Sequence, residues 1–253
     1  MSELQIPKGV QELTKDNRIV RAVWDYRDAR GTVVGYVVRW EGLDGSKEIR
    51  PYFQCAPNGN WRQGGTPPRA PLYELPRLLR SPGVPVLLVE GEKCALSVNE
   101  QTDGLATTSL GGANRASGAD WQPLAGREVL IWPDADEPGW SYARDVLGIL
   151  AQLEPRPHVS VIDANALGLS EGGDVADWLD SHPSAGFQDI LDLPRLTDDA
   201  VERLRESVPP AVLADARRDH SKDVRMSKYV PDIDHILHAA IILARANRRR
   251  LDA

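Results

Sequence analysis

The sequence has few cysteines, no long apolar run and no phosphate-binding P-loop motif. Its two cysteines, Cys55 and Cys94, are too few for a four-ligand structural zinc site, and we expect reduced thiols. No apolar run approaches the roughly 20 residues that span a bilayer. The first residues lack the apolar segment of a secretory signal. We therefore expect a cytoplasmic protein without membrane contact and without a fused P-loop ATPase.

Acidic residues are concentrated in the middle of the chain. The net charge of −7 argues against a protein that coats nucleic acids non-specifically. Residues 15–80 hold 12 Lys or Arg against 7 Asp or Glu, residues 81–200 hold 6 against 20, and residues 201–253 hold 11 against 8. Clustered acids fit a metal-binding core, and basic flanks fit a phosphate backbone. Ordinary solvated surfaces would give the same counts, so each flank leaves both interpretations open.

Two short apolar runs end in acids. Residues 86–89 (VLLV) lead into Glu90, and residues 129–132 (VLIW) lead into Asp134 and Asp136. Short, continuously apolar strands are typical of a buried parallel sheet, whose chemistry lies at the carboxyl ends of the strands. Three neighbouring carboxylates cannot all stay ionised without a cation between them. Because oxygen ligands suit Mg²⁺ or Mn²⁺, we predict a divalent-metal site that handles phosphates.

Glycines and a lysine beside these acids suggest phosphate contacts. Gly91 allows a sharp turn and close approach of a ligand, and the helix expected from Lys93 would favour an anion at its start. Lys93 is placed to meet a phosphate, although a solvated helix residue is the simpler interpretation. A glycine loop with Gly111 and Gly112 follows an expected strand at 105–110, which alone is a weak phosphate signal.

A later acidic pair lies at the start of a short expected helix. Asp174 and Asp177 follow a fourth expected strand at 158–163. An acid at a helix start is most often a cap, yet here it could also reach the metal site. Both interpretations stay open at this point.

The segment from Ile19 to Arg80 is predicted to be a small basic antiparallel sheet. Turn-forming residues separate strand-like runs that are rich in Trp, Tyr and Val. Basic and aromatic residues interleaved on a sheet resemble a face that binds single-stranded DNA, although such aromatics also serve as core or cross-strand partners. The candidate DNA-binding residues are Arg21, Arg39, Arg50, Trp61 and Arg62.

The chain divides into four predicted segments. Residues 1–18 form a tail, 19–80 the β-rich subdomain, 81–197 an α/β domain, and 198–253 a helical region. The alternation of strands and helices in 81–197 predicts a parallel sheet with helices on both faces. The strongest C-terminal helix is expected at 232–251 and ends in three arginines, 248–250. They would either stabilise the helix through its dipole or contact nucleic acid or a partner. His235 and His238 have no third metal ligand in view.

In their order along the chain, these motifs resemble the Toprim domain. Glu90 to Ala95 matches the family's first motif, EGEK followed by a small or acidic residue, and Asp134 to Trp140 matches DxDxxG with a helix after it. A later element, a Gly or Lys followed by DVxDWL, matches residues 173–179, and upstream segments such as 25–31 (DYRDARG) also fit. The resemblance covers roughly 19–182 and is closest to primase-type Toprim proteins of phages, plasmids and integrated elements. It implies a Rossmann-like fold.

The resemblance also implies an activity. It assigns metal binding and catalysis to Glu90, Asp134 and Asp136, with Lys93 as a catalytic phosphate contact and Gly139 near the nucleotide. A DNA primase of this kind would join ribonucleotides on single-stranded DNA with Mg²⁺ or Mn²⁺. The sequence has no zinc-binding cysteine cluster, so template recognition would come from the basic N-terminal sheet, from the C-terminal helices, or from a separate helicase or template-binding subunit. A metal-dependent nuclease and a non-catalytic DNA- or helicase-binding module remain alternatives.

Overall fold

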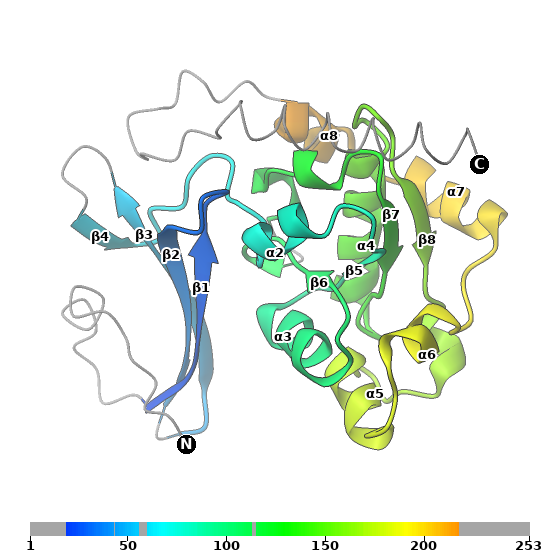
Figure 1. Ribbon diagram of the computed structural model, residues 1–253, viewed down its shortest axis with the longest axis horizontal. Coiled ribbons are helices and arrows are strands. Elements are labelled where there is room, and N and C mark those ends of the chain that lie inside the picture. The colour runs from blue at the N-terminus through cyan, green and yellow to red at the C-terminus, as the bar shows by residue number, and fades with distance from the viewer. Residues whose placement is uncertain (1–18, 43, 56–59, 113–114, 218–253) are drawn as a thin grey trace.

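The first half of the fold is a four-stranded antiparallel sheet. The computed structural model describes residues 19–42, 44–55, 60–112 and 115–217. The strands lie in the order β1-β2-β3-β4 (Figure 1). Their bounds are β1 Ile19–Arg27, β2 Val33–Glu41, β3 Lys47–Cys55 and β4 Asn60–Gln63. The predicted antiparallel sheet is confirmed, and Gly31 in the β1–β2 turn and Gly45 in the β2–β3 turn take positive φ angles.

The second sheet is parallel throughout. Its strands lie in the order β6-β5-β7-β8. Their bounds are β5 Val86–Leu88, β6 Ala106–Thr107, β7 Glu128–Ile131 and β8 His158–Val161. Because β5 and β7 are direct neighbours at the centre, the acids that follow them leave the same edge of the sheet side by side. The predicted α/β architecture is therefore confirmed.

Helices cover both faces of the parallel sheet. On one face, Leu87 and Leu130 pack with α3 (Glu92–Gln101), α5 (Val175–Ser181) and α6 (Phe187–Leu191). On the other face, Leu88 and Ile131 pack with α2 (Leu75–Arg80) and α4 (Glu137–Leu150), and α7 (Asp198–Glu206) and α8 (Pro210–Arg217) lie against that cluster. Alternating residues of one strand thus serve opposite layers, as strand geometry requires.

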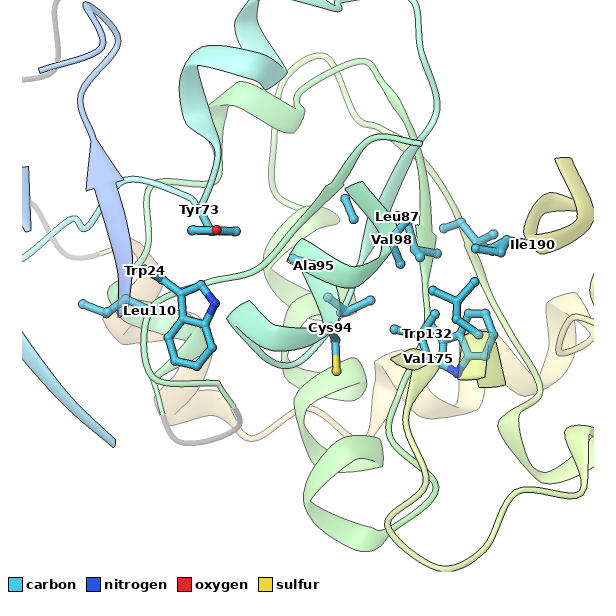
Figure 2. Packing of buried hydrophobic residues seen from close by; sticks show 14 of the residues in the cluster. Trp24, Tyr73, Leu87, Cys94, Ala95, Val98, Leu110, Trp132, Val175 and Ile190 are labelled. Carbon is cyan, nitrogen blue, oxygen red and sulfur yellow. The ribbon is translucent and has the colours of Figure 1, made fainter. Parts of the chain in front are cut away.

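The antiparallel sheet shares a core with the α/β unit. Trp24, Tyr26 and Phe53 belong to the same buried cluster as α3 and the central strands. The Tyr26 and Tyr73 rings lie 5.7 Å apart, and Figure 2 shows Trp24 and Tyr73 beside α3, with Trp132 and Val175 on the far side of that helix. Continuous apolar packing therefore fixes the position of the sheet relative to the strand ends.

Several boundaries differ from the predictions. The helix expected from Lys93 begins one residue earlier, at Glu92. Helix α4 begins at Glu137, where Asp136 caps it and Pro138 occupies its first turn. The strand expected at 105–110 is limited to Ala106–Thr107. Two helices, α7 and α8, occupy the start of the predicted C-terminal helical region, whereas the tail 1–18, the helix at 232–251, His235, His238 and the terminal arginines lie outside the described residues. In the described chain, no helix is both long and apolar enough to cross a membrane.

Candidate active site

A pocket of about 360 Å³ opens between the two sheets, at the carboxyl ends of β5 and β7. One wall comes from the α/β unit and carries charged groups and glycines. The other wall comes from β2 and β3 and is apolar. The lining residues are Val37, Ile49, Pro51, Glu90, Gly91, Glu92, Lys93, Cys94, Leu110, Gly111, Gly112, Asp134 and Asp174. Seven of these thirteen are candidate metal-binding or phosphate-binding residues of the sequence analysis: Glu90, Gly91, Lys93, Gly111, Gly112, Asp134 and Asp174.

The turn from β5 into α3 places Glu90, Gly91 and Lys93 at the pocket. Gly91 is the N-cap of α3, and no side chain caps this helix end. A Cβ at Gly91 would meet no atom within 4 Å, so the approach to the first turn of α3 is open. The Glu90 backbone is fixed because Thr108 Oγ1 donates a hydrogen bond of 2.7 Å to the Glu90 carbonyl. The first turn of α3 therefore faces the pocket with its partial positive charge.

The glycine loop after β6 closes the pocket next to Glu90. Gly111 and Gly112 both have positive φ angles, which favour glycine. A Cβ at Gly112 would lie 3.2 Å from the Glu90 carbonyl oxygen and 3.3 Å from its Cγ. A side chain at position 112 would be strained by the positive φ angle and would push Glu90 away by a few tenths of an ångström. The described chain resumes at Arg115.

The turn from β7 into α4 separates the two aspartates. Asp134 lines the pocket, whereas the Asp136 side chain caps α4 by accepting a hydrogen bond of 2.8 Å from the Gly139 N–H. A Cβ at Gly139 would lie 2.5 Å from the Asp134 carbonyl oxygen, so this glycine lets α4 pack against the Asp134 backbone. Since its N–H already serves the cap, phosphate binding by Gly139 stays a prediction.

Asp134 has a strongly perturbed carboxyl group at the pocket. Burial has the largest effect, and together with the nearby Glu90, Asp174 and Asp136 carboxylates it raises the pKa of Asp134 to about 8, while Lys93 opposes this rise. A carboxyl group held neutral at physiological pH by burial and by neighbouring like charges is typical of functional sites. The acids that follow β5, β7 and β8 thus interact electrostatically, as their positions in the sequence predict.

Asp174 serves both as a helix cap and as a pocket residue. Its Oδ1 accepts hydrogen bonds from the Ala176 and Asp177 N–H groups, at 2.8 and 3.0 Å, and its Oδ2 lies 3.3 Å from Lys93 Nζ. Burial lowers the pKa of Lys93, but Asp174 and other neighbours raise it to a net value above normal. Asp177 completes the capping box by accepting a bond from the Asp174 N–H, and of the two acids only Asp174 lines the pocket.

Glu92 is a pocket residue that sequence reasoning missed. Its side chain is buried, and Tyr26 Oη on β1 donates a hydrogen bond of 2.8 Å to Glu92 Oε1. Burial raises the pKa of Glu92, and the Tyr26 hydrogen bond partly offsets this. The bond ties the antiparallel sheet to the first turn of α3. The pattern EGEK contains Glu92, but nothing in the sequence pairs it with Tyr26.

The candidate DNA-binding residues do not share one face of the antiparallel sheet. Arg39 pairs with Ile49, and Arg62 pairs with the core residue Phe53, so both lie on the face toward the pocket. Arg50 and Trp61 lie on the opposite face, where Trp61 packs against Tyr36 with ring centroids 5.1 Å apart. Arg21 sits at an irregularity in the β1–β2 register and forms an ion pair with Glu41. These five residues therefore do not form a single binding surface.

The comparisons with known proteins bear on the fold. No protein-family model and no curated protein matches the sequence. A DNA primase domain from Pseudomonas aeruginosa superposes with a TM-score of 0.51 and 17% identity, over 88% of this chain and 72% of that chain. The fold of this chain is therefore similar to the fold of that DNA primase domain.

Two further primase structures are also similar. The zinc-binding and RNA polymerase domains of the Aquifex aeolicus primase give a TM-score of 0.49 at 18% identity, with 87% of this chain and 54% of that chain covered. The E. coli primase catalytic core gives 0.46 at 19% identity, with 76% and 57% covered. This chain therefore spans little more than half the length of these two structures.

The acids in the sequence predict a divalent-metal site, and the chemistry of the pocket can be compared with that expectation. Within the described residues, no three His, Cys, Asp or Glu side chains already stand in the arrangement of a metal site. The chemistry of the donors nevertheless fits, because Glu90, Asp134 and Asp174 offer only carboxylate oxygens. The repulsion that contributes to the raised pKa of Asp134 is also what a bound cation would relieve.

Proposed function

We propose that this protein is a primase-type nucleotidyltransferase that makes short primers on single-stranded DNA from ribonucleotides. One observation carries the proposal: Glu90, Asp134, Asp174 and Lys93 meet in a single pocket between two sheets. Likeness to a primase domain in fold supports it. The proposal places the protein in the replication of a phage, plasmid or other mobile element, together with a separate replicative helicase or template-binding subunit.

The acids would hold the metal, and one of them would lose a proton when the metal binds. Glu90 and Asp134 are the primary ligands for Mg²⁺ or Mn²⁺, and Asp174 completes the set, with Asp136 holding the turn in place. When bound, the ion lowers the pKa of the attacking hydroxyl and offsets charge on the transferred phosphate. Because the pKa of Asp134 is about 8, cation binding at neutral pH releases a proton from this side chain.

The remaining residues would orient the phosphates. Primer synthesis joins a 3′-hydroxyl to an α-phosphate, with loss of pyrophosphate. The open first turn of α3 behind Gly91 offers backbone N–H groups to a phosphate. Lys93, 3.3 Å from Asp174, is positioned to exchange this partner for a phosphate oxygen. Glu90, at the end of β5, is the alternative general base for the hydroxyl proton.

A primer-synthesis assay tests the proposal. The purified chain is incubated with single-stranded DNA, four ribonucleotides, one of them labelled, and Mg²⁺ or Mn²⁺, and the products are separated on a denaturing gel. We expect short labelled oligomers from the wild type. We expect the same from Asp180→Ala, which removes an exposed acid of α5. Asp134→Ala should lose roughly a hundredfold or more in rate, because metal stabilisation of the transition state is worth several kcal/mol.

The same gel separates the alternatives. Cleaved template without labelled oligomers would replace the proposal with a metal-dependent nuclease. Full activity of Asp134→Ala would show that the assignment of the metal site to this pocket is wrong. If neither oligomers nor cleavage appeared and calorimetry detected no Mg²⁺ or Mn²⁺ binding, the non-catalytic module would be the better description.

A further inference from the structure

The wall of the pocket opposite the acids is apolar. Val37 on β2 pairs directly with Pro51 on β3, and Ile49 pairs with Arg39 two residues farther along β2. Alternation along the strands therefore turns Val37, Ile49 and Pro51 to the same face, and all three line the pocket. Leu110, from the segment before the glycine loop, adds an apolar group from the α/β unit.

Ile49 is exposed at a place where a β-strand normally buries such a side chain. It is 58% exposed, although Val37 on the same face is 2% exposed. A single exposed isoleucine is common on protein surfaces and by itself means little. Ile49 differs because it lines a pocket whose other wall carries Glu90, Lys93 and Asp134. A ligand that filled this pocket would touch charged groups on one side and hydrocarbon on the other.

A nucleotide has this division within one molecule. Its phosphates carry the negative charge, and its base is a flat heterocycle with apolar faces. We propose that Val37, Ile49 and Pro51 form a base-binding subsite for the nucleoside triphosphate whose phosphates lie against Lys93 and the first turn of α3. This inference rests on the proposed function and deepens it, because it states how the substrate is held.

The chemistry of the wall also defines its selectivity. The side chains of valine, isoleucine and proline have no hydrogen-bond donors or acceptors. They can contact the face of a base but form no hydrogen bonds with its edge. The subsite should therefore bind all four ribonucleoside triphosphates with similar affinity, as a primer-making enzyme requires when the template chooses the base.

A binding experiment on the full chain tests the subsite. Calorimetry in Mg²⁺ compares four ribonucleoside triphosphates, inorganic triphosphate and a short single-stranded oligodeoxynucleotide. Ile49→Ser should weaken binding of each nucleoside triphosphate about five- to tenfold, as expected for the loss of roughly 50 Å² of apolar contact. The same variant should bind inorganic triphosphate as the wild type does. Ile19→Ser is the matched control, since Ile19 is an exposed isoleucine (48%) on the same sheet that does not line the pocket.

Each outcome decides between explanations. Unchanged nucleoside triphosphate affinity in Ile49→Ser overturns the subsite. Loss of oligodeoxynucleotide binding alone would assign the wall to the template strand and also overturns it. Equal loss for inorganic triphosphate would mean that the variant disturbs the whole pocket, and the subsite is rejected. Lys93→Ala should weaken the binding of nucleoside triphosphates and of inorganic triphosphate. If it weakens the binding of neither, the proposed function fails together with the inference. If only the result expected for Ile49→Ser fails, the proposed function stands.

Discussion

Replacing Asp134 with asparagine should stabilise the metal-free protein at neutral pH. In the folded protein, burial and the nearby acids raise the pKa of Asp134 to about 8, whereas an unfolded aspartate titrates near 3.9. Asparagine has nearly the shape of the protonated carboxyl group but cannot ionise. The variant therefore removes the free-energy cost of keeping this group protonated in the folded state, while leaving the packing of the turn almost unchanged.

The size of the effect follows from proton linkage. A carboxyl group with a raised folded pKa contributes most to stability below its unfolded pKa, and this contribution is lost as the pH rises toward the folded pKa. Between pH 5 and pH 7 the folded state holds one proton on Asp134 that the unfolded state has lost. The free energy of unfolding should therefore fall by about 1.4 kcal/mol per pH unit, or about 2.7 kcal/mol over this range.

Urea unfolding at several pH values, in a metal chelator, measures this dependence. The wild type should lose about 2.7 kcal/mol more than Asp134→Asn between pH 5 and pH 7. Asp180→Asn, which changes an exposed acid in α5, should follow the wild type. Replacing the chelator with Mg²⁺ should stabilise the wild type at pH 7 more than it stabilises Asp134→Asn. Parallel pH curves for wild type and Asp134→Asn would refute the account of the acid cluster.

Two further substitutions test the framework around the site by urea unfolding. Gly139→Ala would place a Cβ 2.5 Å from the Asp134 carbonyl oxygen, so we expect a loss of about 1–3 kcal/mol, against almost none for Gly83→Ala, where the added Cβ meets nothing within 4 Å. Arg127→Met removes buried hydrogen bonds to the Leu78 and Val84 carbonyls and should cost about 2–4 kcal/mol. If Gly139→Ala were as stable as Gly83→Ala, the close packing at Gly139 would be contradicted. If Arg127→Met were as stable as the wild type, the Arg127 hydrogen bonds would not contribute to stability.

The strands beside the acids were predictable from the amino-acid pattern. The apolar runs before Glu90 and Asp134 predicted buried strands, and Gly91 and Pro133 after them predicted the strand ends. Asp174 also carried a readable signal, since an acid before an apolar helical pattern predicts a cap. These features were predictable because they depend on neighbours within a few residues along the chain.

The contacts between distant segments were not predictable from the sequence. The order β6-β5-β7-β8 brings the two acidic turns together, and no local pattern fixes that order. The sequence also could not tell that Arg39 and Arg50 lie on opposite faces, because the strand register determines the face of each side chain. The sequence marks Ile49 only as a strand residue. The packing of the antiparallel sheet against α3 places it at the pocket opposite the acids. Contacts of this kind depend on packing between segments far apart in the chain, which composition and periodicity do not encode.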